Sequence, residues 1–128
     1  MTVEVVLDAS ALAASLHDEP GAARVDALIE YAAISTVNLG EALQASIRRG
    51  HAVDGLVGEL EAYGLVIEPF TVGDAEMAAA LWTPTRAAGL SFGDRSCLAL
   101  ASRLGVPVLT TDRAWAKVDV GVPIELIC

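Results

Sequence analysis

The sequence has few of the residues that define several protein classes. Only 5% of its 128 residues are aromatic, only Cys97 and Cys128 are cysteines, and no apolar run approaches the roughly 20 residues that span a bilayer. Two cysteines are too few for a disulfide framework and lack a zinc-ligand spacing. The opening residues, Met-Thr-Val-Glu, place no basic stretch before an apolar one, so they predict no signal peptide. We therefore expect a soluble, cytoplasmic protein.

Positive charge is scarce as well. Eight basic residues stand against 17 acidic ones, which gives a formal net charge of −9. Such a chain lacks the basic surface with which proteins bind nucleic-acid phosphates unaided. Any binding to nucleic acid would have to depend on bound cations, a local arginine patch or a dimer groove. The charge equally suits a basic protein partner.

Aliphatic residues, by contrast, are abundant. Hydrophobic residues make up 54% of the chain, enough for one domain over residues 1–128 with a core of Ala, Val and Leu. No linker, low-complexity tract or repeat interrupts it. Apolar patterns predict strands at 3–7, 33–36, 65–67, 106–110 and 124–127. Helical patterns cover 10–16, 21–32, 37–49, 51–63, 74–88 with a break at Pro84, 94–103 and 113–117. This alternation predicts an α/β fold with a parallel sheet between helical layers.

Carboxylates follow two of the predicted strands. Asp8 comes directly after the first strand and Asp112 after the strand at 106–110, so both lie at the carboxyl edge of a parallel sheet, where α/β proteins bind ligands. Asp94 opens a helix, and Glu41 lies within the helix at 37–49. Clustered carboxylates suit Mg²⁺ or Mn²⁺, which can polarise a phosphoryl oxygen and supply hydroxide for phosphodiester cleavage.

A simpler interpretation exists for each of these acids. Asp is a common helix N-cap, and Asp8, Asp94 and Asp112 each precede a helix. Glu41 lies off the apolar face of Leu39, Leu43 and Ile47, so solvent exposure is its default.

Other polar residues are weaker candidates. Ser10 and Thr111 are small hydroxyl residues at strand–helix junctions, able to hold a carboxylate or to cap a helix, and Asn38 shares the face of Glu41. We expect Cys97 to be core, His17 and His51 to be solvated, and Asp74 and Glu76 to lie on a solvated helix face.

Four segments carry a family resemblance. They are VVLDASAL from Val5, STVNLGEA from Ser35, LSFGDRSCLALA from Leu90 and LTTDRAW from Leu109. Together, and in this order, they resemble the PIN-domain ribonucleases, specifically the VapC toxins of bacterial toxin–antitoxin pairs. The resemblance covers essentially the whole chain.

The resemblance implies a fold, an activity and partners. The fold would be a PIN-like three-layer sandwich with a mostly parallel sheet of about five strands. The activity would be Mg²⁺- or Mn²⁺-dependent hydrolysis of RNA. A homodimer and a VapB-type antitoxin that blocks the active site are implied too, and a basic antitoxin would fit the charge of −9.

The resemblance also assigns roles to residues. The catalytic, metal-binding carboxylates would be Asp8, Glu41, Asp94 and Asp112. The supporting residues would be Ser10, which matches the family's hydroxyl position, with Asn38 and Thr111. The possible RNA contacts are Arg113 and Arg95.

Other functions remain open. A haloacid-dehalogenase-like phosphatase would use Asp8 as its nucleophile, but such enzymes carry a second Asp where this chain has Ser10, and they need a lysine, of which Lys117 is the only one. A catalytically silent PIN-fold binding module is another alternative. A phospho-acceptor signalling domain would need its Asp after a central strand, whereas the third predicted strand ends at Glu68 and Pro69.

Overall fold

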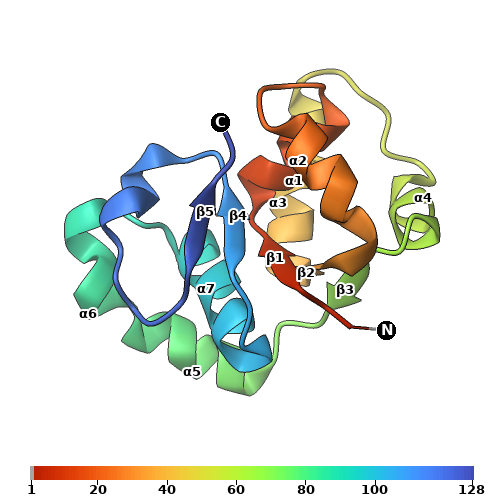
Figure 1. Ribbon diagram of the computed structural model, residues 1–128. Coiled ribbons are helices and arrows are strands. Elements are labelled where there is room, and N and C mark those ends of the chain that lie inside the picture. Colours follow the sequence, from red (N-terminus) through yellow and green to blue (C-terminus); the bar gives the residue numbers. More distant parts are fainter. Residues whose placement is uncertain (1) are drawn as a thin grey trace.

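The computed structural model describes residues 2–128 and contains one five-stranded sheet (Figure 1). Its strands are β1 (Val5–Leu7), β2 (Ala32–Ser35), β3 (Val66–Glu68), β4 (Val108–Thr110) and β5 (Ile124–Leu126). They lie in the order β3-β2-β1-β4-β5, and every neighbouring pair is parallel. The predicted α/β fold with a parallel sheet of five strands is confirmed.

Helices form a layer on each side of this sheet. One layer contains α1 (Ala9–Leu16), α2 (Ala22–Leu28), α3 (Thr36–Arg48) and α4 (Leu56–Ala62), and the other contains α5 (Val72–Ala80), α6 (Trp82–Thr85) and α7 (Phe92–Leu104). Three short 3-10 helices, η1 (Ile29–Tyr31), η2 (Arg86–Ala88) and η3 (Arg113–Lys117), complete the chain. The three-layer sandwich is therefore also confirmed.

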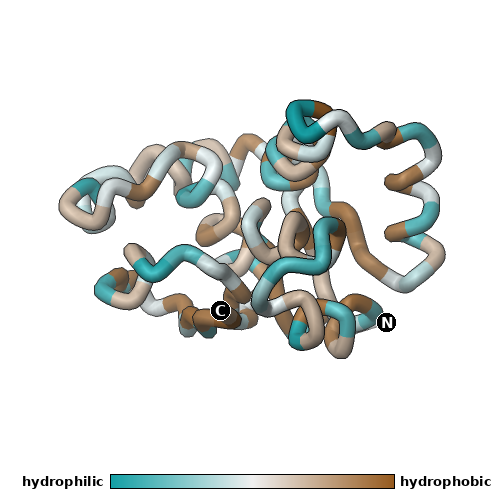
Figure 2. The backbone as a smooth tube through the Cα atoms, turned by 90° about the horizontal axis from the view of Figure 1, so that it is seen from above, coloured by the Kyte–Doolittle hydropathy of each residue, from teal (hydrophilic) through white to brown (hydrophobic). Residues whose placement is uncertain are grey.

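The first strand explains why two layers form. Successive side chains of a strand point to opposite faces, so Val5 and Leu7 enter one apolar cluster and Val6 enters the other. All three are buried, as a strand covered on both faces requires. Figure 2 shows hydrophilic positions along the periphery, both in loops and within helices. Within residues 2–128, no helix is both long and apolar enough to cross a bilayer.

Several predicted boundaries were wrong. The helix expected at 21–32 ends at Leu28, because Ala32 is buried and begins β2, between β1 and β3. The helix expected at 51–63 begins only at Leu56, after Gly55 adopts a left-handed conformation. The helix expected at 74–88 starts two residues earlier, at Val72; it is split in two, as Pro84 predicted, with the interruption at Leu81.

Two side-chain predictions were also wrong. Ile47, assigned to the apolar face of α3, is 58% exposed, and the buried face of that helix includes the polar residues Asn38 and Ser46 instead. Asp74, assigned to a solvated face, is 3% exposed and pairs with Arg103. Alternation of polar and apolar residues does not reveal polar groups that are buried together with a partner.

Candidate active site

Asp8 lies at the carboxyl end of the central strand β1 and is only 4% exposed. Its Oδ1 accepts hydrogen bonds from the Ser10 hydroxyl (2.7 Å) and the Ala11 N–H (2.8 Å), and its Oδ2 accepts one from the Thr110 hydroxyl (2.5 Å). Asp8 therefore caps α1, as the simpler interpretation predicted, and it is also tied to β4. About one of its four lone-pair positions remains free for another ligand.

The environment of Asp8 disfavours its ionised form. Burial raises the pKa of this carboxyl group from 3.8 to about 6, and the nearby Asp94 carboxylate adds to the rise. The hydrogen bonds from Thr110, Ser10 and Ala11 act in the opposite direction without offsetting it. An ionised Asp8 is thus short of nearby positive charge, which a bound cation would supply.

The end of β4 is joined to the start of α1 by hydroxyl groups. The Ser10 hydroxyl accepts the backbone N–H of Thr111 (3.0 Å), and the Thr110 hydroxyl accepts that of Asp112 (3.1 Å). The Asp112 carboxylate is exposed and accepts the N–H of Ala114 (2.9 Å), so it caps η3. Asp112 is therefore connected to Asp8 through Thr110.

Asp94 belongs to one of two matching helix starts. Residues 71–74 (TVGD) and 91–94 (SFGD) both form a capping box, in which the hydroxyl residue and the Asp exchange hydrogen bonds with each other's backbone N–H. The first box's Asp74 forms a bidentate pair with Arg103. Asp94 is half-buried, has no such cationic partner among residues 2–128, and lies near enough to Asp8 to raise its pKa.

Glu41 is held against the first turn of α7 by Asn38. The Asn38 Nδ2 donates to Glu41 Oε1 (2.9 Å) and to the Gly93 carbonyl oxygen (2.9 Å). Both partners accept hydrogen bonds, which identifies the amide end facing them as Nδ2. The other end, Oδ1, is a buried acceptor with no hydrogen-bond partner among residues 2–128. A Cβ at Gly93 would lie 2.6 Å from Glu41 Oε1, so the carboxylate occupies the space that any other residue would fill. Glu41 itself is exposed, as its position on α3 predicted.

Three of the four predicted acids lie near one buried residue. Cys97 is fully buried in α7, which confirms its assignment to the core. Burial raises the pKa of its thiol, and the charges of Asp8, Asp94 and Glu41 raise it further. Carboxylates from the end of β1, from α3 and from α7 therefore converge in one region.

The ligand types in this region suit a hard divalent cation. The available ligands are carboxylate, amide and hydroxyl oxygens, and both the pKa of Asp8 and the unpartnered Asn38 Oδ1 indicate a missing positive or donor group. As the side chains stand, no three His, Cys, Asp or Glu side chains of residues 2–128 are close enough to hold one ion. Mg²⁺ often binds through one or two carboxylates and keeps several waters, which is what this arrangement offers.

The two arginines predicted to contact RNA differ in availability. Arg113 follows Asp112 and is exposed. Arg95 is half-buried, donates from Nη1 to the Ala78 carbonyl oxygen (2.8 Å) and lies 5.3 Å from the centre of the Phe92 ring. Arg95 is therefore already engaged within the fold.

Sequence reasoning missed two residues of this site. Thr110, not Thr111, supplies the hydroxyl that contacts Asp8, because successive strand residues alternate in direction and the last buried position falls on Thr110. Gly93 is the second, because the sequence assigns it no role and places it just before the helix predicted at 94–103. The sequence did contain a signal for Gly93. A capping box does not require glycine at this position, so a glycine there indicates that another group needs the space of its side chain.

Comparison with known proteins agrees with this fold. The family model for the PIN domain matches residues 5–121. Among solved structures, the DNA-bound VapBC of Salmonella typhimurium is similar with a TM-score of 0.72 at 16% identity, covering 99% of this chain and 100% of that chain. VapC20 of Mycobacterium tuberculosis, described as a sarcin–ricin loop cleaving toxin, gives 0.69 at 17%, with 94% and 99% covered. FitAcB of Neisseria gonorrhoeae gives 0.67 at 18%, with 94% and 95% covered. No curated protein sequence matches significantly.

The fold and the site define the class of this protein: an α/β sandwich with acidic residues at the carboxyl edge of a parallel sheet. The chain belongs to the PIN domain family, because the family model covers most of it. The family resemblance expected from the four sequence segments is confirmed.

Proposed function

We propose that this protein is a metal-dependent endoribonuclease toxin of the VapC type. The single observation that supports this best is the placement of Asp8, Glu41 and Asp94 around the buried Cys97 at the carboxyl edge of the sheet, with the Glu41 carboxylate against Gly93, the residue before Asp94. Such a group of carboxylates is costly to leave uncompensated, and it suits a site for Mg²⁺ or Mn²⁺ beside a phosphate.

The four acids would differ in how rigidly they hold the metal ion. Asp8, Glu41, Asp94 and Asp112 would hold Mg²⁺ or Mn²⁺, which when bound neutralises phosphate charge and lowers the pKa of the attacking water. Asp8 is immobilised by three hydrogen bonds, so it is the rigid member of the set. Glu41 and Asp112 are exposed, so they are the members able to adjust when RNA arrives.

An antitoxin and a second copy are part of the proposal. The Klebsiella pneumoniae structure with the same fold is a toxin–antitoxin complex, and the Salmonella structure is a VapBC complex. A VapB-type antitoxin with basic side chains would complement a chain of net charge −9. We further propose that the protein is cytoplasmic and forms a homodimer. Light scattering on the purified protein would test the dimer.

Metal-dependent cleavage is the direct test. The purified protein should cut RNA with Mg²⁺ or Mn²⁺ and not with EDTA, and saturating Mn²⁺ should raise its melting temperature because the ion binds only the folded state. In cells, the chain alone should arrest growth and its genomic neighbour should restore it, with sequencing of RNA ends identifying the target. A folded sample that takes up neither ion would rule the proposal out.

Gly93→Ala should reduce cleavage without unfolding the protein. The new methyl group would displace the exposed Glu41 carboxylate from Asn38, and misplacing one catalytic group by about 1 Å can cost about 10²-fold in rate. Gly73→Ala is the matched control, because it occupies the same position in the other capping box and meets nothing closer than 3.7 Å. Equal activity of the two variants would contradict a role for Glu41.

The alternatives predict different outcomes. A phosphatase would form a covalent phosphate on Asp8, detectable by mass after incubation with a phosphate ester. A silent binding module would bind RNA or its antitoxin and leave RNA intact with either metal ion.

A further inference from the structure

Basic residues are concentrated in one part of the chain. Residues 77–118 carry five basic and two acidic side chains, whereas the other 86 residues carry three basic and 15 acidic ones. The two acids of this segment are Asp94 and Asp112, both candidates for the active site. A strongly acidic protein thus contains one segment with net positive charge, and two of the four candidate acids lie within it.

Three of the exposed cations of this segment form no salt bridge with another residue of 2–128. Arg24, Arg49 and Arg103 form salt bridges with acids, and Arg95 is bonded within the fold. Among residues 2–128, Arg86, Arg113 and Lys117 are exposed and have no acidic side chain within 4.0 Å.

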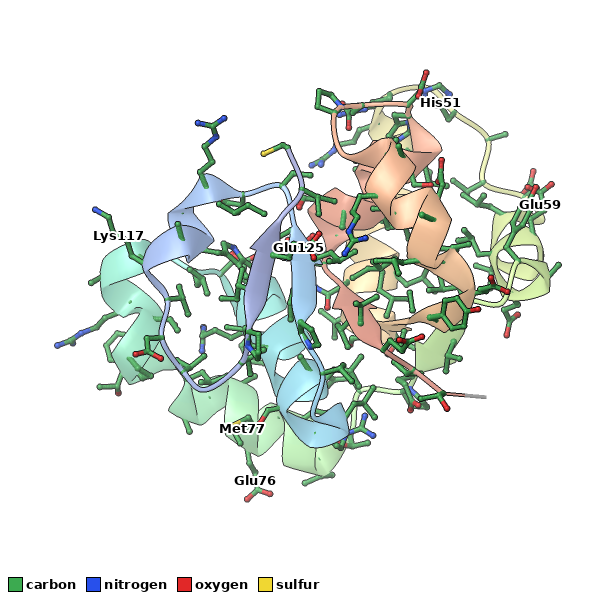
Figure 3. The ribbon with its side chains drawn as sticks, viewed as in Figure 1. His51, Glu59, Glu76, Met77, Lys117 and Glu125 are labelled. Carbon is green, nitrogen blue, oxygen red and sulfur yellow. The ribbon has the colours of Figure 1, made fainter. Side chains whose placement is uncertain are left out.

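These three cations share one region of the surface. Arg86 lies on η2, and Arg113 and Lys117 lie on η3, which contacts η2. The fully buried Trp115 side chain packs into the core and attaches η3 to it. Lys117 projects outward beside α6, at the opposite end of the molecule from Glu59 on α4 (Figure 3).

An exposed aromatic ring lies in the same region. Trp82 on α6 is 50% exposed, and the Arg86 guanidinium lies 5.0 Å from its ring centre. Proteins bind single-stranded nucleic acid with cations that contact its phosphates and with aromatic rings on which its bases stack. This region offers both. We name Trp82, Arg86, Arg113 and Lys117 the α6–η3 surface.

We infer that the α6–η3 surface binds single-stranded RNA on one side of the carboxylate site. This rests on the proposed function for the substrate class. Arg113 directly follows Asp112, so a strand leaving the site meets this surface first. On the other side, the layer of α1 to α4 carries mostly acids and would repel the backbone. The RNA should therefore contact the protein on the α6–η3 side of the carboxylate site and not on the side of α1 to α4.

Binding can be separated from cleavage by working without catalytic metal. With EDTA present, a fluorescent single-stranded RNA should bind the wild type with a salt slope near −2, as about three phosphate contacts imply. Arg86→Gln/Arg113→Gln/Lys117→Gln should weaken binding at least about tenfold and nearly abolish that slope. Arg24→Gln/Arg48→Gln/Arg49→Gln removes equal charge elsewhere and should leave the affinity within about twofold of the wild type.

Tryptophan fluorescence gives an independent readout. RNA should quench Trp82, and the quenching should disappear in Trp82→Phe, because Trp115 is fully buried. Equal affinity of the two triple variants, or quenching that survives Trp82→Phe, would overturn the inference. So would a triple variant at α6–η3 that changes only the oligomeric state, which would make this surface a subunit contact. RNA that is bound here but never cut would overturn the nuclease proposal alone.

Discussion

Asp8→Asn should abolish RNA cleavage and yet stabilise the metal-free protein. Removing one preorganised electrostatic group from an active site typically costs at least about 10²–10³-fold in rate, the cost of a single oxyanion-hole donor, and Asp8 is the most rigidly held of the four acids. The amide keeps the shape of the carboxyl group but removes a buried charge that has no cationic partner in the part of the chain that the structure describes. A rise of the pKa from 3.8 to about 6 corresponds to about 3 kcal/mol, which is an upper limit for the gain.

The stabilisation should depend on pH in a defined direction. Below pH 3.8 the Asp8 carboxyl group is protonated in both the folded and unfolded chains, and above about pH 6 it is ionised in both. Between these values only the folded chain keeps the proton, so the wild type should lose stability as the pH rises from about 4 to 6. Chemical unfolding with EDTA should show this fall for the wild type and not for Asp8→Asn.

A control separates this effect from general charge reduction. Asp54→Asn removes one exposed acid and should change neither cleavage nor the pH dependence. If Asp8→Asn cuts RNA at the wild-type rate with Mg²⁺ supplied, Asp8 is not catalytic.

Asp74→Ala should cause a large loss of stability. Asp74 is 3% exposed, accepts two hydrogen bonds from Arg103 at 3.0 and 3.1 Å, and completes the capping box with Thr71. Burial alone would raise its pKa, but the bonds from Arg103 and Thr71 outweigh burial and lower it. Removing it leaves a partly buried guanidinium without its main partner, which should cost about 2–4 kcal/mol of unfolding free energy.

The chain contains a matched pair of the same geometry at the surface. Arg24 also grips Glu125 with two hydrogen bonds, at 2.7 and 3.1 Å, but these side chains are 52% and 42% exposed. Glu125→Ala should therefore cost no more than about 1 kcal/mol. Urea unfolding of both variants measures the difference, and equal losses would show that burial does not decide the strength of these pairs.

The two capping boxes show where sequence patterns stop being informative. TVGD and SFGD start their helices in the same way, and both Asp residues read equally well as caps. Asp74 binds Arg103, 29 residues away in the chain, whereas Asp94 lies near enough to Asp8 to raise the pKa of that carboxyl group. Which of them is structural depends on those distant neighbours, which no local pattern contains.

Helix boundaries failed for a related reason. Ala32 continues the helical pattern of residues 21–32, but its place between β1 and β3 makes it a strand residue. Burial in the sheet outweighs a local preference worth less than about 1 kcal/mol per residue.

The sequence by itself determined the parallel sheet between helical layers, the family, and the four acids as candidates. The sheet follows from local periodicity, the candidate acids from where strands end and helices begin, and the family from the resemblance carried by four segments. Only the tertiary structure decided that Thr110 holds Asp8, that Glu41 lies against Gly93, and that Asp74 pairs with Arg103. These contacts join residues distant in sequence, so they arise from the packing of helices on the sheet, which has no counterpart in any single segment.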